Sequence, residues 1–207
     1  MCGDKISKIR NYYGERRNEC EDHRRLGWES RQAQEGRFET LLGNLELEGK
    51  TILDVGCGLG NLYGFLKSKG IKADYTGVDI LAEMTQDAKL KYRDGCFMCL
   101  DIFKEGRFKD GEFDIVFTSG IFNIDLGNNR EFLENALKKF FSIAGEAVCF
   151  NILDPGSPEK EKGYFYMPPD EAVKIAMRTG PQGMTAKTSA NPYSHDYTVI
   201  CLLHPAG

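Results

Sequence analysis

The sequence contains no long apolar run and carries only a small net charge. The first absence argues against a membrane-spanning protein, and the second argues against a protein that binds polyanions. No segment approaches the roughly 20 consecutive apolar residues of a membrane-spanning helix. The N-terminal Met-Cys-Gly-Asp-Lys also lacks the apolar stretch of a signal peptide. The formal charge of −4 over 207 residues provides no strong field for attracting a polyanion. We therefore expect a soluble, cytoplasmic protein with neither a membrane nor a nucleic-acid partner.

Side chains that bind metals are also scarce. The chain has three histidines, at positions 23, 195 and 204, and a single Cys-x-x-Cys pair, Cys96 and Cys99. A structural zinc site usually needs two such pairs or added histidines, and a thioredoxin-type pair would begin a helix. We therefore expect no metal and interpret both cysteines as buried strand residues. The odd total of seven cysteines suits a reducing compartment.

Glycine is abundant, and three glycines mark the stretch around which the chain is organised. Residues 51–55, Thr-Ile-Leu-Asp-Val, are predicted to form a short buried strand. Gly56, Gly58 and Gly60 follow as a turn that opens directly into a predicted helix at 61–69. Such a turn presents unpaired backbone N–H groups and bare backbone to a ligand at the positive end of a helix dipole. The pattern predicts a binding site for a nucleotide-like cofactor.

The spacing of these glycines distinguishes two families of cofactor. Dinucleotide-binding proteins carry Gly-x-Gly-x-x-Gly. Here the third glycine of that pattern is replaced by Asn61, and the glycines run Gly-x-Gly-x-Gly. With Asp54 ahead of it, the string resembles the first motif of class I S-adenosylmethionine-dependent methyltransferases. The resemblance implies that S-adenosylmethionine is the cofactor and S-adenosylhomocysteine the product.

Two acids downstream of the turn strengthen this resemblance. Asp79 ends the next predicted strand, 19 residues beyond Gly60 (79 − 60). At about this interval a nucleotide-binding sheet places a carboxylate on ribose hydroxyls. Asp101 ends a third apolar segment, which we expect to run as a strand from Cys96 to Phe103. In methyltransferases of this class an acid at that place accepts the adenine amino group.

The order of predicted elements defines the fold class and the domains. Strands and amphipathic helices alternate as far as the strand expected at 147–153, and two late strands close the chain without a long helix between them. We expect an α/β fold with a doubly wound, mostly parallel seven-stranded sheet and an antiparallel C-terminal hairpin. Residues 48–207 would form this Rossmann-like methyltransferase domain, and residues 1–47 an N-terminal helical cap. The cap is expected to close over the cofactor and become more ordered when it binds; the alternative is an arm packed permanently on the flank of the sheet.

Residues 27–38, 119–123 and 150–151 add a narrower resemblance to a group of small prokaryotic class I methyltransferases with undefined acceptors. The expected function is in-line methyl transfer to a small-molecule acceptor. The predicted cofactor-binding residues are Asp54, Gly56, Cys57, Gly58, Gly60, Asn61, Asp79, Ile80, Asp101, Ile102, Phe103, Ser119 and Gly120. The candidate substrate residues are Tyr12, Tyr13, Trp28, Phe122, Asn123, Tyr164, Tyr166 and His195.

Other functions share parts of this pattern. A catalytically silent binding module would keep the glycine turn but lose the acids, whereas this chain has both Asp79 and Asp101. An NAD-dependent oxidoreductase also uses a glycine turn and a ribose-binding acid, but Asn61 and the antiparallel ending argue against it. An adenine or cytosine N-methyltransferase would carry a Pro-Pro-Tyr or Pro-Pro-Phe box where this chain has Ser-Gly-Ile-Phe at 119–122.

Overall fold

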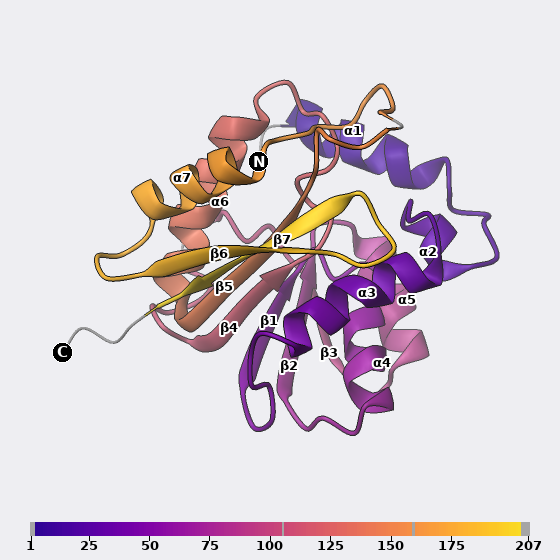
Figure 1. The fold of residues 1–207 in the computed structure, drawn as a ribbon. Coiled ribbons are helices and arrows are strands. Elements are labelled where there is room, and N and C mark those ends of the chain that lie inside the picture. The colour runs from indigo at the N-terminus through magenta and orange to yellow at the C-terminus, as the bar shows by residue number, and fades with distance from the viewer. Residues whose placement is uncertain (1–2, 105, 159, 204–207) are drawn as a thin grey trace.

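The computed structural model describes residues 3–104, 106–158 and 160–203, which build a three-layer α/β fold around one seven-stranded sheet (Figure 1). The strand order is β3-β2-β1-β4-β5-β7-β6, and every pairing is parallel except those of β7 with β5 and β6. The expected doubly wound sheet with an antiparallel C-terminal hairpin is confirmed. The strands are β1 (Thr51–Val55), β2 (Asp74–Asp79), β3 (Cys96–Cys99), β4 (Phe113–Thr118), β5 (Ala144–Leu153), β6 (Thr185–Ala190) and β7 (Asp196–Leu202).

Helices cover both faces of this sheet because alternate residues of the central strands are apolar on both sides. In β5, Val148 and Phe150 pack toward one layer, and Ala147 and Cys149 pack toward the other. Helices α6 (Asn129–Ile143) and α7 (Pro169–Thr179) cover the first face. The second face is covered by α3 (Arg31–Leu42), α4 (Asn61–Ser68) and α5 (Ala82–Lys91).

The N-terminal segment contributes α1 (Gly3–Gly14), α2 (Asp22–Arg25) and α3. Helix α3 begins where the Ser30 hydroxyl accepts a hydrogen bond from the N–H of Ala33 at 3.0 Å. It buries Phe38 and Leu41 against the sheet. Helix α1 lies beyond the carboxyl ends of β1, β2 and β4, at the top of Figure 1. It ends at Gly14.

Strand β3 corrects two expectations from the sequence. It is the edge strand and ends at Cys99, so Asp101 and Phe103 lie in the loop that follows rather than within the strand. Cys96 and Cys99 are exposed free thiols, not buried residues. The reason is that β3 is a four-residue edge strand paired with β2 alone, so Phe97 is its one buried residue and the cysteines at its two ends stay open to solvent. Within the part of the chain that is described, we find no helix with the length and apolar character needed to span a bilayer.

Candidate functional site

The glycine turn joins β1 to α4 at the carboxyl edge of the sheet. Gly56, Gly58 and Gly60 have φ angles of +76°, +53° and +73°, which side-chain-bearing residues rarely adopt. A Cβ at Gly56 would lie 2.3 Å from Ile121 Cγ2, and one at Gly58 would lie 2.8 Å from Leu26 Cδ2. The turn is therefore enclosed by the segment after β4 and by the N-terminal arm, and neither leaves room for a side chain.

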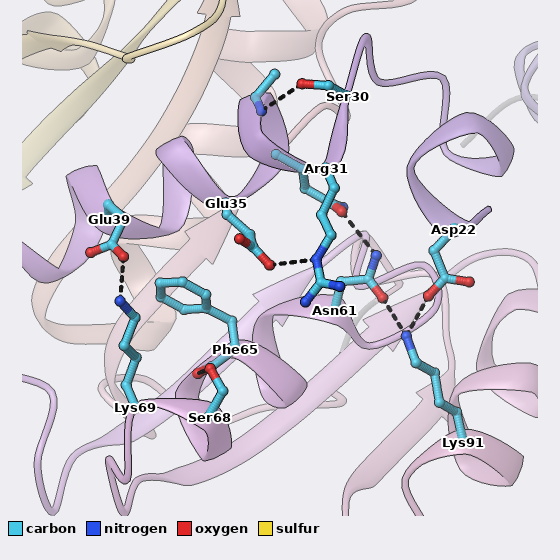
Figure 2. A network of polar contacts seen from close by, with 12 residues as sticks. Asp22, Ser30, Arg31, Glu35, Glu39, Asn61, Phe65, Ser68, Lys69 and Lys91 are labelled. Atoms are coloured by element: carbon cyan, nitrogen blue, oxygen red, sulfur yellow. Dashed lines mark hydrogen bonds and ion pairs between the residues drawn. The ribbon is translucent and has the colours of Figure 1, made fainter.

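Gly60 has a different role from the other two glycines. A Cβ there would lie 2.7 Å from the Phe97 ring, so this position allows the start of α4 to pack closely over β3. The next residue, Asn61, is fixed by its side chain. Its Nδ2 donates to Gln34 Oε1 at 2.9 Å, and its Oδ1 accepts from Lys91 Nζ at 2.8 Å (Figure 2).

Lys91 also forms an ion pair with Asp22 of α2, so a chain of polar contacts runs from α2 through α5 to the start of α4 and on to α3 (Figure 2). Around it, Arg31 pairs with Glu35 at 2.8 Å. These exposed pairs contribute little stability individually. The contacts through Lys91 and Asn61 have a positional consequence, because they attach the N-terminal arm to the glycine turn.

A half-buried carboxyl group, Asp79, and a buried one, Asp54, flank the turn. Asp79 accepts hydrogen bonds from the N–H of Gly58 at 3.0 Å and the N–H of Leu81 at 2.9 Å. Burial raises its pKa to about 6, although the backbone N–H groups oppose that rise. Asp54 is 4% exposed and accepts from the Tyr75 hydroxyl at 2.7 Å. Burial outweighs that hydrogen bond and raises the pKa of Asp54 to about 7.

A first cavity, here named the apolar cavity, opens between the ends of β1, β2 and β4 and the helix α1. It brings together many of the residues predicted to bind a cofactor. Ile9, Leu100 and Ile121 also line it and were not predicted, since their side chains reach the cavity only through the tertiary fold. The predicted residues that line it are Gly56, Asp79, Ile80, Asp101, Ile102, Phe103, Ser119 and Gly120, together with Tyr13.

A second cavity, the turn cavity, lies on the other side of the glycine turn. Tyr13, Gly56, Asp79 and Ser119 line both cavities, which places Asp79 at their junction. Ser119 Oγ is buried and has no hydrogen-bond partner among the described residues. The remaining predicted residues of the turn cavity are Asp54, Cys57, Gly58 and Asn61, and it also contains Trp28 and the unpredicted Leu26, Gln34 and Met84.

A third cavity, the aromatic cavity, gathers most of the candidate substrate residues. Trp28 lines both the turn cavity and this one, so its side chain lies between them. Asn123 is only 7% exposed here. The lining residues are Gly27, Trp28, Glu29, Arg37, Asn123, Leu153, Ser157, Glu161, Tyr164, Tyr166 and His195.

Two of the candidate aromatic residues do not line any of these three cavities. Phe122 is 1% exposed and packs edge-on against Phe132 and Phe150, so the structure corrects the expectation that its ring faces a ligand. The sequence places it beside ligand-facing residues, but the backbone directs its side chain into the core. Tyr12 instead has its hydroxyl 2.6 Å from that of Tyr164 and supports the arm from outside the cavity.

A buried ion pair behind the aromatic cavity was not predicted as part of the site. Arg37 Nε lies 2.6 Å from Asp196 Oδ2, and both side chains are almost fully buried. The guanidinium carbon also lies 4.1 Å from the centroid of the Trp28 ring. Asp196 accepts a further bond from Asn151, whose Oδ1 accepts from the N–H of Gly120 at 2.8 Å. One network therefore fixes the Trp28 ring and the Gly120 backbone, and its ion pair joins Arg37 to Asp196, 159 positions away in the sequence.

Comparison with known proteins agrees with this geometry. Residues 52–141 match the family described as "Methyltransferase domain". A Mycobacterium tuberculosis protein named as a methyltransferase is 38% identical over 79 residues, which are 37% of this chain and 44% of that protein. The malonyl-[acyl-carrier protein] O-methyltransferase of Acetivibrio thermocellus is 35% identical over 106 residues, covering 48% of this chain and 37% of that enzyme. The matches thus span less than half the length of these relatives.

Solved structures match over a larger part of the chain. Magnesium protoporphyrin IX methyltransferase from Synechocystis PCC 6803, crystallised with S-adenosylhomocysteine, has a TM-score of 0.68 at 16% identity, covering 96% of this chain and 99% of that one. A methyltransferase from Bacteroides fragilis in complex with S-adenosylhomocysteine has a TM-score of 0.59 at 18% identity, covering 79% and 75%. At such identities the likeness concerns the fold. Residues 52–141 thus match a methyltransferase domain, and the chain shares the fold of methyltransferases whose crystal structures hold S-adenosylhomocysteine.

Proposed function

We propose that this protein binds S-adenosylmethionine across the apolar and turn cavities and transfers its methyl group to a small-molecule acceptor. The observation that carries the proposal is the position of Asp79, which lines both cavities next to the glycine turn. A carboxylate at this junction can accept hydrogen bonds from both ribose hydroxyls. On either side of it, the apolar cavity would receive the adenine and the turn cavity the amino-acid portion.

The residues present fit such a cofactor. Ile80 and Ile102 line the apolar cavity, where they provide flat apolar contact for a base, and Asp101 lines it as an acceptor for an amino group. Ser119 Oγ, buried without a partner in the described part of the chain, offers a hydrogen bond at the place where the two cavities meet. The bare backbone at Gly58 allows a ligand to approach closely.

S-adenosylmethionine supplies an electrophilic methyl group: the acceptor's lone pair forms a bond to this carbon as the carbon–sulfur bond breaks and its electron pair stays on sulfur. The protein's tasks are alignment and exclusion of water. Tyr13 contributes to both, since its ring lines both cavities and its burial raises the pKa of its hydroxyl, which stays protonated. We propose that residues 1–47 act as the cover of the site and residues 48–207 as the methyltransferase domain.

The aromatic cavity is the proposed acceptor site. It shares Trp28 with the turn cavity and is also lined by Asn123, Tyr164, Tyr166 and His195. The size of this partly open cavity suits a small molecule, and the chain's net charge of −4 gives no general attraction for nucleic acid.

Calorimetric titration with S-adenosylhomocysteine and, separately, with NAD tests the cofactor assignment. We expect a one-to-one complex with S-adenosylhomocysteine and none with NAD. Release of S-adenosylhomocysteine in the presence of a broad panel of acceptors then tests transfer. Binding without release for any acceptor would favour the silent module, and binding of NAD instead would refute the proposal.

A further inference from the structure

One buried hydrogen-bonding group at the aromatic cavity has no partner. Asn123 Oδ1 is buried, and no donor among residues 3–104, 106–158 and 160–203 contacts it. The backbone of Asn123 is fixed on both sides, because its N–H donates to the carbonyl of Gly120 at 3.1 Å and its own carbonyl accepts from the N–H of Phe165 at 2.7 Å. A buried amide oxygen without a donor is unfavourable. The group therefore favours a ligand that carries a hydrogen-bond donor.

The two neighbouring hydroxyl groups make their contacts elsewhere. The hydroxyl of Tyr164 is paired with that of Tyr12 at 2.6 Å. The hydroxyl of Tyr166 accepts a hydrogen bond from the N–H of Glu161 at 3.1 Å. Both rings are therefore held in place by contacts within the protein, and neither hydroxyl contacts Asn123 Oδ1.

The charges around the cavity favour a cation. Glu29 and Glu161 line it as exposed carboxylates. Arg37 is the one permanently charged cation among the described lining residues, and Asp196, 2.6 Å away, balances it. The lining also includes the electron-rich rings of Trp28, Tyr164 and Tyr166, and such ring faces attract cations. Trp28 already has the Arg37 guanidinium over one face.

We infer that the methyl acceptor of this enzyme is an amine on an apolar or aromatic skeleton, held with its N–H against Asn123 Oδ1. The inference deepens the proposed function and depends on it. An amine that arrives as its ammonium ion first releases one proton to water, which restores the nitrogen lone pair. The neutral amine then attacks the methyl carbon with this lone pair, the carbon–sulfur bond breaks, and sulfur keeps that electron pair. The positive charge passes from sulfur to nitrogen.

This charge movement explains what the lining residues do. Nitrogen begins neutral and ends as an ammonium, and Glu29 and Glu161 stabilise the charge that develops on it. The same carboxylates disfavour an acceptor that is itself a carboxylate or phosphate. Such an anion would be repelled by their negative charges, and it has no hydrogen-bond donor to offer to Asn123 Oδ1. Asn123 positions the nitrogen, and Trp28 lines the boundary at which the aromatic cavity meets the turn cavity.

The single tryptophan provides a readout that does not require turnover. Trp28 is the only tryptophan in the sequence and lines both the turn and aromatic cavities, so its fluorescence should respond to ligands in either. The protein is first saturated with S-adenosylhomocysteine, whose binding is established by calorimetry. It is then titrated with 2-phenylethylamine and with 3-phenylpropanoate, two probes of similar size that differ in the charged group.

We expect the amine to bind at least about tenfold more tightly than the carboxylate, and Asn123→Leu to remove about tenfold of the amine affinity. Asn123→Asp keeps an acceptor oxygen and should bind the amine at least as well as the native protein. Asn18→Leu, the same change at an exposed site in the arm, is the matched control and should change nothing.

Two kinds of failure are distinguishable in this experiment. If S-adenosylhomocysteine does not bind, the proposed function itself is wrong. If it binds but the carboxylate binds as tightly as the amine, if neither probe binds, or if Asn123→Leu leaves the amine affinity unchanged, the amine inference is overturned while the proposed function stands.

Discussion

Asp79 is the residue whose removal tests the cofactor site most directly. Its carboxylate accepts from Gly58 and Leu81 in the structure and has further lone pairs for ribose hydroxyls. A hydrogen bond to a charged group contributes about 1.5–3 kcal/mol, which corresponds to a change in Kd of about 10- to 150-fold. We therefore expect Asp79→Ala to weaken S-adenosylhomocysteine binding by this factor, and Asp79→Asn, which retains one acceptor oxygen, to weaken it less.

Calorimetric titration measures these affinities, and thermal unfolding shows whether each variant is folded. Asp74→Ala is the matched control, because Asp74 begins the same strand at its opposite, exposed end. Its affinity should equal that of the native protein. A folded Asp79→Ala protein with unchanged affinity would show that the carboxylate does not contact the cofactor, and the assignment of both cavities would then be wrong.

The raised pKa of Asp79 adds a dependence on pH. Because its pKa is about 6, the carboxyl group becomes protonated as the pH falls through that value and loses acceptor capacity. Binding should therefore weaken from about pH 8 to about pH 5. In Asp79→Ala the part of this dependence centred near the pKa of Asp79 should disappear. A part due to Asp54, whose pKa is about 7, should remain.

Three further predictions concern the turn, the network behind it and the arm. Gly58→Val should abolish S-adenosylhomocysteine binding in calorimetry, because the φ of +53° at this position strains any side chain. Circular dichroism should show that the variant is folded. If the variant binds normally, the glycine turn is not part of the cofactor site. Arg37→Leu leaves Asp196 buried without its partner and should lower the free energy of unfolding in urea by about 3–5 kcal/mol. Arg31→Leu, at an exposed ion pair, should lower it by less than about 1 kcal/mol. Equal effects of the two substitutions would contradict the assignment of a stronger role to the buried pair. Hydrogen exchange over residues 5–40 should slow when S-adenosylhomocysteine binds, and equal protection in both states would indicate a permanently packed arm.

The sequence alone determined the fold and much of the cofactor site, because both depend on local patterns. The alternation of apolar strands and helices specified the sheet. The glycine spacing indicated a ligand-binding turn, and Asp79 and Asp101 end the two segments that follow it. Because parallel strands end at the same edge of a sheet, these features together predicted a binding site at that edge. The same local reasoning failed for Cys96 and Cys99, because an edge strand cannot be recognised from its composition.

Only the tertiary structure decided which side chains share a cavity. Phe122 and Asn123 are adjacent in the sequence, yet one is buried in the core and the other lines the aromatic cavity, because the backbone directs them to different sides. Arg37 and Asp196 meet across 159 positions, and no periodicity connects residues so far apart. Packing of the arm against the sheet edge brings Trp28 between two cavities, and this contact depends on many weak interactions distributed along the whole chain.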